Sequence, residues 1–213
     1  LLGNADNLAN CLTVESLDEP TGVEFDVVRQ DGTREFHSVK RQTSAQEWSL
    51  AKLCSPDAKT GRSILGDLFS KLGAAKHHRA VFVSSTGANQ LRELHERAEP
   101  SSSLADFEKR LAGASYLVTA FAKYVVPLTS GCKATAFDHL RRVRVALIDE
   151  PQLIRRVEQR IHALICRSDG GEADGKAIRL LMSDFVLDKL GTPLVLQDIR
   201  TILEPNFMLR DGS

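Results

Sequence analysis

The fold is decided by the stretch Val23-Glu-Phe-Asp-Val-Val-Arg-Gln-Asp-Gly-Thr-Arg-Glu-Phe-His-Ser-Val-Lys40. Apolar and polar residues alternate on both sides of Asp31-Gly32, and Asp-Gly between two such runs is a strong hairpin signal. Gly32 suits the left-handed position of a three-residue loop, in which a type I turn is closed by a bulge. The stretch therefore predicts two antiparallel strands.

The register of this hairpin decides which side chains meet. With a three-residue loop, Arg29 faces Thr33 across the turn, whereas a two-residue turn would shift the pairing by one residue and separate Asp26 from Lys40. Side chains alternate between the two faces of a strand. The odd-numbered, mostly apolar residues are expected on the core side: Val23, Phe25, Val27 and Val39. The even-numbered residues are expected to share the other face: Glu24, Asp26, Ser38, Lys40 and Gln42.

The periodicity of the rest of the chain predicts an α/β fold. Apolar residues recur at helical spacing over 44–76, residues 80–85 form a short buried strand, and the pattern from residue 90 onward is almost wholly helical, with an extra strand near 143–148. We expect an α/β core over residues 1–99, built on a small mixed sheet with a helix packed across it. A helical extension is expected over residues 100–213.

Composition narrows the classes of function. Lys plus Arg and Asp plus Glu each number 28, so the formal net charge is zero, which removes the strongest global argument for nucleic-acid binding. No stretch approaches the roughly 20 apolar residues of a membrane-spanning helix, so no membrane partner is expected. The four cysteines form no CxxC pair, which argues against a zinc ribbon or a dithiol redox site and favours a reduced, cytoplasmic setting. We read the chain as one module of a longer polypeptide.

Two carboxylates and a lysine on one sheet face have a chemical use. Carboxylate oxygens bind Mg²⁺ or Mn²⁺, which lowers the pKa of a bound water and neutralises charge on a phosphate. A nearby ammonium orients that water or stabilises the transition state. The alternative is a solvated sheet face whose charges are simply hydrated, which is common on antiparallel sheets.

An acid, a hairpin and then x-x-Lys at the end of the next strand resemble the PD-(D/E)xK nuclease core. More narrowly, the chain is similar to the double-stranded-DNA endonuclease effector domain of bacterial anti-phage systems, found in CBASS effectors, NACHT-type STAND NTPases and Lamassu-type proteins. The resemblance covers residues 12–95 and rests on these segments: Val23-Glu-Phe-Asp-Val-Val, His37-Ser-Val-Lys-Arg-Gln, Trp48-Ser-Leu, Gly61-Arg-Ser-Ile-Leu-Gly-Asp-Leu and Val81-Phe-Val-Ser-Ser-Thr.

The resemblance implies a restriction-endonuclease-like fold and a Mg²⁺- or Mn²⁺-dependent endonuclease that cuts double-stranded DNA with little sequence preference. Asp26 corresponds to the metal-binding acid and Lys40 to the motif lysine. Ser38 departs from the family, which usually has an acid or Gln there, so Glu24 or Glu15 would supply the second metal-binding carboxylate. Gln42 would contact the metal-bound water or a phosphate. In such effectors, self-association through other parts of the full chain switches cleavage on.

Two further expectations accompany this assignment. Lys59 and Arg62, before a helix that begins near Ser63, and Arg41 are expected to contact DNA phosphates, although the first two also fit an ordinary helix-capping loop. The alternative functions are a catalytically inactive nuclease-fold module that binds DNA or protein during assembly, which Ser38 would permit, and a helical adaptor on which the hairpin is only an addition.

Overall fold

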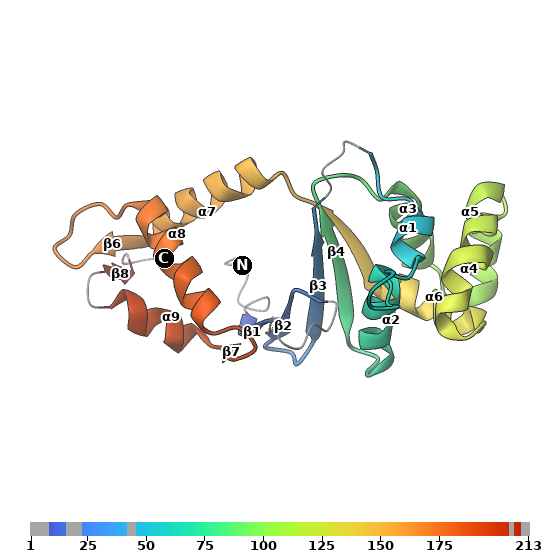
Figure 1. The fold of residues 1–213 in the computed structure, drawn as a ribbon, viewed down its shortest axis with the longest axis horizontal. Helices are drawn as coiled ribbons and strands as arrows, with labels where there is room; N and C mark the ends of the chain where they lie inside the picture. Colours follow the sequence, from blue (N-terminus) through green and yellow to red (C-terminus); the bar gives the residue numbers. More distant parts are fainter. Residues whose placement is uncertain (1–8, 16–22, 42–45, 205–206, 210–213) are drawn as a thin grey trace. The chain divides into compact units, whose positions relative to one another are not determined.

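The computed structural model describes residues 9–15, 23–41, 46–204 and 207–209. The main sheet is formed by β1 (Ala9–Val14), β2 (Phe25–Arg29), β3 (Arg34–Lys40), β4 (Arg79–Ser84), β5 (Val143–Leu147) and β7 (Pro193–Leu194). These strands are ordered β5-β4-β3-β2-β1-β7, with both parallel and antiparallel pairs (Figure 1). The predicted α/β class, with a mixed sheet and flanking helices, is confirmed.

The chain divides into two compact units. The core unit comprises residues 20–26 and 32–147, and the terminal unit comprises residues 1–19, 27–31 and 148–213. The six-stranded sheet draws strands from both units, and β2 contributes residues to each. The candidate site, described below, lies within the core unit.

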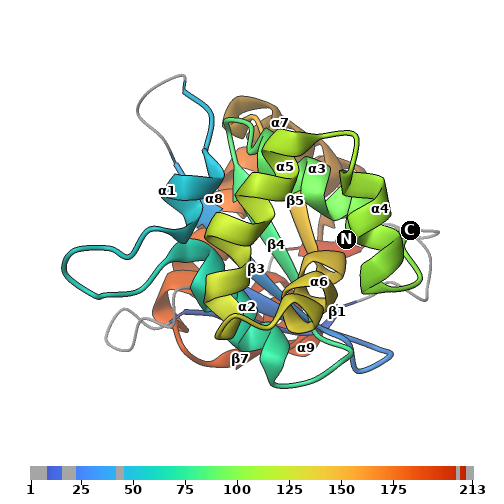
Figure 2. The ribbon, with the colours of Figure 1, turned by 90° about the vertical axis from the view of Figure 1, so that its right-hand side faces the viewer.

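Helices of the core unit pack on one face of β3, β4 and β5, as Figures 1 and 2 show. They are α1 (Leu50–Cys54), α2 (Ile64–Gly73), α3 (Asn89–Ala98), α4 (Leu104–Leu111), α5 (Ser115–Ala120) and α6 (Lys133–Arg142), with the π-helical turn η2 (Phe121–Val125) and the 3-10 turn η3 (Val126–Thr129). Serine hydroxyls cap three of them. Ser49 accepts a hydrogen bond from Lys52 N at 3.2 Å before α1, Ser63 accepts one from Gly66 N at 3.1 Å before α2, and Ser103 accepts one from Asp106 N at 3.2 Å before α4. These caps explain where α1, α2 and α4 begin.

Strands β3, β4 and β5 are parallel and in register. Phe36 lies beside Ala80, and Ala80 lies beside Val143, so these residues face the same side of the sheet. All three belong to the hydrophobic core, together with Phe82 and the apolar faces of the helices. The core therefore lies between this face of the sheet and helices α1 to α6, and it includes residues before and after position 100.

The sequence assigned the wrong face of β3 to the core. Its even-numbered residues point into the core, because Phe36 is buried there and Ser38 has no exposed surface, whereas Val39 is 42% exposed. The prediction places odd-numbered residues on the core side because those of the preceding strand are apolar, and it applies the same rule to β3. Strands inside a sheet are partly covered on both faces, so alternation does not identify the buried side.

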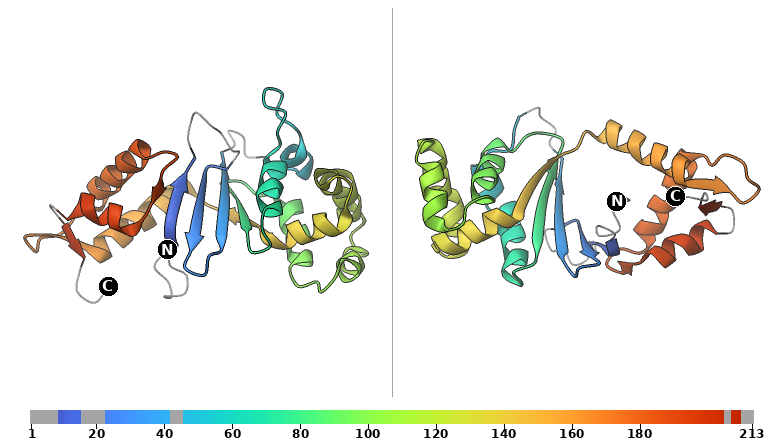
Figure 3. Two further views of the ribbon diagram at one scale, coloured as in Figure 1. Left: turned by 90° about the horizontal axis from the view of Figure 1, so that it is seen from below. Right: turned by 180° about the vertical axis from the view of Figure 1, so that it is seen from behind.

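The hairpin has the predicted turn. Gly32 adopts a left-handed conformation, with φ of 78°, as the bulged loop requires. The rings of Phe25 and His37 stack with centroids 4.3 Å apart, which agrees with the expected pairing across the strands. Figure 3 shows β2 and β3 side by side, joined by this turn.

The terminal unit has its own small core. It contains α7 (Glu150–Leu164), α8 (Gly175–Asp188) and α9 (Leu196–Leu203), together with the strand pair β6 (Ile165–Arg167) and β8 (Phe207–Leu209). Ile161, Ile165, Ala173 and Ile178 are buried together. Gly175 allows α8 to approach α7 closely, because a Cβ there would lie 2.7 Å from the Glu158 carbonyl oxygen. Within the described residues, no helix is both long enough and apolar enough to cross a membrane.

Candidate functional site

The candidate site begins with an ion pair at the carboxyl end of β3. Lys40 is the last residue of that strand, and Glu24 directly precedes β2. The Lys40 ammonium donates a hydrogen bond to Glu24 Oε1, and the backbone N–H of Val39 donates to Glu24 Oε2 at 2.7 Å. The side chains of Lys40 and Glu24 are 28% and 32% exposed, so solvent reaches the pair. The predicted approach of these two residues is present in the structure.

The site is extended by the neighbouring parallel strand. Lys40 lies in register with Ser84, the last residue of β4. The Ser84 hydroxyl accepts hydrogen bonds from the indole N–H of Trp48 at 2.9 Å and from Thr86 N at 3.2 Å. Trp48 therefore fixes the segment that precedes α1 against the end of β4. In α/β sheets, ligands bind at the carboxyl ends of parallel strands, which is where these residues gather.

Ser38 supplies a buried oxygen to this region. It lies two residues before Lys40, on the same face of β3, beside Phe82 of β4. Its side chain is fully buried, and among the described residues its hydroxyl has no hydrogen-bond partner. A buried hydroxyl without a partner costs free energy, about 1–3 kcal/mol by mutational measurements, so its presence calls for a physical reason.

Asp26 takes part in a different ion pair. Both of its carboxylate oxygens accept hydrogen bonds from Arg34, at 2.7 Å from Nε and 3.0 Å from Nη2. The Arg34 guanidinium also lies over the ring of Phe36, 5.3 Å from its centroid. Asp26 is 9% exposed and lies two residues along β2 from Glu24, about 7 Å away. The acid beside Lys40 is thus Glu24, whereas Asp26 is held by Arg34.

The remaining predicted residues are placed as follows. Glu15 directly follows β1 and belongs to the terminal unit, whereas Glu24 and Lys40 belong to the core unit. Gln42 lies outside the described residues. Arg41 is exposed directly after β3.

The loop before α2 is internally bonded. The Asp57 carboxylate accepts hydrogen bonds from the backbone N–H groups of Thr60 and Lys59, and these bonds hold the pKa of Asp57 below its usual value. Arg62 forms an ion pair with Asp67 in the first turn of α2, with Nε 2.8 Å from Oδ1. Lys59 is exposed. These contacts account for the loop as the start of a helix, which is the second of the two interpretations that the sequence left open.

The described residues form no ready-made site for a divalent cation. Among the described residues, no three His, Cys, Asp or Glu side chains lie close enough together to hold a metal ion. Mg²⁺, however, is commonly bound by one or two carboxylates together with water and substrate phosphate oxygens. Glu24 is a carboxylate at the end of the sheet, and the Ser38 hydroxyl is a buried oxygen without a partner. Both Glu24 oxygens accept hydrogen bonds, from Lys40 and from the Val39 N–H, and Ser38 is fully buried, so a cation completed by phosphate would need Lys40 to release Glu24. Asp26 is held at both oxygens by Arg34.

Sequence reasoning missed the partners of two residues. Arg34 and Asp26 are both even-numbered residues on paired strands. The predicted register places such residues on the same face, so this contact could have been predicted from it. The hydrogen bond from Trp48 to Ser84 joins residues that are far apart in the sequence, and no local pattern predicts it.

No family model matches the chain, and no curated protein is similar to it at a significant level. Solved structures of the Acinetobacter baumannii Cap4 SAVED/CARF-domain containing receptor are similar in part. The receptor structure has 11% identity and a TM-score of 0.47, with 92% of this chain and 41% of that chain covered. Its complexes with the cyclic trinucleotides 3′3′3′-cAAA and 2′3′3′-cAAA give the same identity, TM-score and coverage of this chain, with 42% and 40% of those chains covered.

The chain thus spans about two fifths of the length of these receptors. These structures bear on one of the predictions, namely the identity of the binding partner. The ligands named for the similar structures are cyclic trinucleotides, not double-stranded DNA. The assignment of double-stranded DNA as the partner is therefore corrected. The expectation that Lys59, Arg62 and Arg41 contact phosphate is not tested by these structures and stays a prediction.

Proposed function

We propose that this chain is a metal-dependent phosphodiester hydrolase of the PD-(D/E)xK type that serves as an effector domain in anti-phage defence. The observation that carries the proposal is the pairing of Lys40 with Glu24 at the carboxyl end of β3, next to the buried hydroxyl of Ser38. The family resemblance of residues 12–95 supports it. The structure changes one assignment within the proposal, because Glu24 replaces Asp26 as the acid beside the lysine.

Each residue has a distinct role in this proposal. Glu24 and Ser38 would hold the divalent cation, which supplies Lewis-acid activation of water and neutralises phosphate charge when bound. Lys40 carries a positive charge on a flexible stem, so it can leave Glu24 and contact a phosphate oxygen or orient the attacking water. The hydrogen bond between Trp48 and Ser84 keeps the neighbouring strand end fixed while Lys40 moves.

Self-association of the full chain forms the regulatory part of the proposal. The chain has zero formal net charge, so its general attraction for a polyanionic substrate is weak. Bringing several copies together raises the effective concentration of sites without any new contact. A domain of this kind is inactive when alone and becomes active when assembled.

A second candidate is a catalytically inactive nuclease-fold module that binds other proteins during assembly. Two observations favour it. Ser38 stands where the family usually has an acid or Gln. Both carboxylate oxygens of Asp26 accept hydrogen bonds from Arg34, so neither is available to a cation. In this candidate, the pair of Glu24 and Lys40 contributes only to the hairpin.

The test uses a substrate that makes no assumption about the natural one. Hydrolysis of bis(p-nitrophenyl) phosphate is followed with Mg²⁺, with Mn²⁺ and with EDTA, for the protein alone and after it is fused to a trimerising coiled coil. We expect metal-dependent hydrolysis that increases on trimerisation and is lost in Lys40→Ala. The matched control is Lys76→Ala, which removes an exposed lysine from the loop before β4. Hydrolysis that is absent in every state, or equal in Lys40→Ala and the wild type, supports the inactive module instead.

A further inference from the structure

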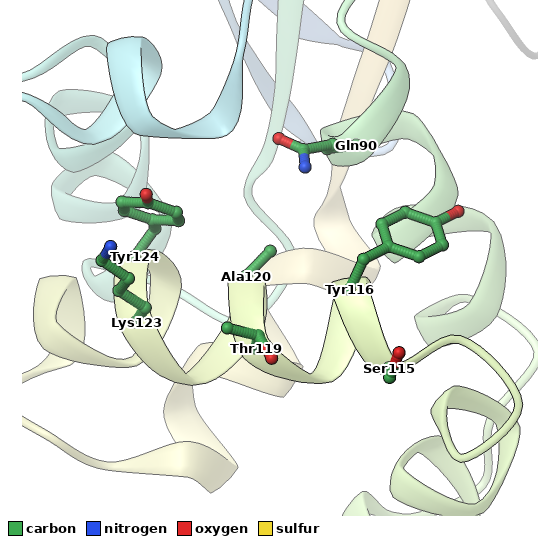
Figure 4. Close-up of a pocket in the computed structure, with 7 residues that line it drawn as sticks. All are labelled: Gln90, Ser115, Tyr116, Thr119, Ala120, Lys123 and Tyr124. Carbon is green, nitrogen blue, oxygen red and sulfur yellow. The ribbon is translucent and has the colours of Figure 1, made fainter.

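A shallow cavity lies on the helical side of the core unit, away from the ion pairs of the hairpin. Its volume is about 350 Å³. Its lining residues, shown in Figure 4, come from α3, α5 and the π-helical turn η2: Gln90, Ser115, Tyr116, Thr119, Ala120, Lys123 and Tyr124. The cavity is thus built by one face of a continuous helix and by the start of α3.

The local structure explains why these side chains gather. On α5 and η2, the lining residues recur at about one helical turn, from Ser115 through Thr119 to Lys123. The π-helical turn is anchored by Phe121 and Val125, which are buried in the core. Such turns insert an extra residue into a helix, and they occur frequently at functional sites. Here the turn carries the two residues with the most distinctive chemistry, Lys123 and Tyr124.

The one charged group and the free amide group of the cavity are hydrogen-bond donors, and its hydroxyl groups can donate or accept. Gln90 Oε1 accepts a hydrogen bond from Leu50 N at 3.2 Å, which leaves the amide NH₂ of Gln90 as the group turned toward the cavity, as Figure 4 shows. Lys123 adds an ammonium group, and its Nζ lies 5.1 Å from the ring centroid of Tyr124. None of the seven lining residues carries a carboxylate. The lining therefore favours a negatively charged ligand.

Two tyrosine rings add flat apolar surfaces to this donor set. The Tyr116 hydroxyl donates to Glu93 and points away from the cavity, so its ring forms one wall (Figure 4). Tyr124 is half-buried beside Lys123. A volume of about 350 Å³ lies at the lower end of the range for small-molecule sites, about 300–1,000 Å³, and suits a single ring system with one charged group.

We propose that this cavity binds a nucleoside phosphate. Lys123 contacts the phosphate, the base packs against a tyrosine ring, and the amide of Gln90 donates a hydrogen bond to the base. Proteins that bind single-stranded nucleic acids combine positive charge with aromatic rings on which bases stack, and the same two interactions are available here to one nucleotide. The inference does not depend on hydrolysis at Lys40, because none of its residues belongs to that site.

The test is calorimetric titration of the full chain with adenosine 5′-monophosphate, adenosine and inorganic phosphate. We expect the monophosphate to bind at least 10-fold more tightly than adenosine or phosphate alone. Lys123→Ala should weaken monophosphate binding at least 10-fold and leave adenosine binding unchanged, whereas Lys123→Arg should retain most of the affinity. Lys76→Ala is the matched control and should bind as the wild type does. Lys123 is exposed, so its variants should fold, and circular dichroism verifies this.

A single-stranded adenylate pentanucleotide distinguishes the two sources of the ligand. Tighter binding of the pentanucleotide, again dependent on Lys123, assigns the cavity to a nucleotide within a strand. Equal or weaker binding assigns it to a free nucleotide. The proposal is overturned if neither ligand binds at millimolar concentration, or if binding is unaffected by both Lys123→Ala and Gln90→Leu. Hydrolysis measured on the same Lys123→Ala protein separates failure here from failure of the proposed function.

Discussion

Two ion pairs lie on one hairpin, and they differ in the kind of basic group that each carboxylate bonds. Asp26 has both oxygens bonded to the planar guanidinium of Arg34, at 2.7 and 3.0 Å. Glu24 gives one oxygen to the Lys40 ammonium and the other to the backbone of Val39. An arginine fork fixes a carboxylate geometrically, whereas a lysine is a point charge on a flexible stem. From this difference we expect the first pair to contribute more to stability, and the second to be the one that takes part in the proposed activity.

Activity gives the largest expected difference between the two pairs. Glu24→Gln should lower the rate of metal-dependent phosphodiester hydrolysis by about 100-fold, because it removes the charge that holds the cation and orients Lys40. Asp26→Asn should lower it by less than about 5-fold. Both are measured as kcat on bis(p-nitrophenyl) phosphate with the trimerised protein. If Asp26→Asn proves as damaging as Glu24→Gln, the site is centred on Asp26, as the family resemblance implies.

The effects on stability should have the opposite order, with the Asp26 variant affected more than the Glu24 variant. Asp26→Ala should lower the free energy of unfolding by about 2 kcal/mol, because it removes a carboxylate that is only 12% exposed and forms two hydrogen bonds with Arg34. Glu24→Ala removes a carboxylate that is 32% exposed and should cost less than about 1 kcal/mol. Urea unfolding followed by circular dichroism measures both. Equal losses would mean that the two pairs do not differ in their structural roles.

Ser38 provides a test in which stability and activity move in opposite directions. Ser38→Ala removes a buried hydroxyl without a partner, so it should raise the free energy of unfolding by about 1 kcal/mol. The same variant should weaken the dependence of hydrolysis on Mg²⁺, because it removes an oxygen donor. Ser84→Ala is the control: its hydroxyl accepts the hydrogen bond of Trp48, so that variant should be destabilised. A destabilised Ser38→Ala would show that its hydroxyl has a structural partner.

The smallest expected effects on stability come from replacing each basic residue with the other type, in the separate variants Arg34→Lys and Lys40→Arg. Arg34→Lys should cost roughly 0.5–1 kcal/mol of stability, because a lysine cannot bond both oxygens of Asp26 at once. Lys40→Arg should change stability by no more than about 0.5 kcal/mol. Urea midpoints of the two variants supply the comparison. If Lys40→Arg is the more destabilised of the two variants, the Glu24–Lys40 pair depends on its basic residue more than the Asp26–Arg34 pair does, which contradicts the distinction drawn here.

The sequence predicted local features of this hairpin more successfully than its surroundings. The positive φ of Gly32, the strand at Val143–Leu147 and the approach of Glu24 to Lys40 follow from residues close in the sequence or joined by one turn. The buried face of β3 could not be predicted, because it depends on helices that arrive from later in the chain. For the same reason, no local pattern predicts the hydrogen bond from Trp48 to Ser84.

The parallel pairing of β3 with β4 has a consequence for the order of folding. The hairpin needs only a short turn, but β4 can join β3 only after the intervening segment with α1 and α2 has been folded back. Contacts between residues far apart in the chain form slowly, because closing the intervening loop costs conformational entropy before any favourable contact is made. Lys40 and Ser84 therefore become neighbours late, and a nascent or half-folded chain carries the lysine without the strand end beside it. The proposed site at Lys40 is therefore completed only when the core unit has almost finished folding.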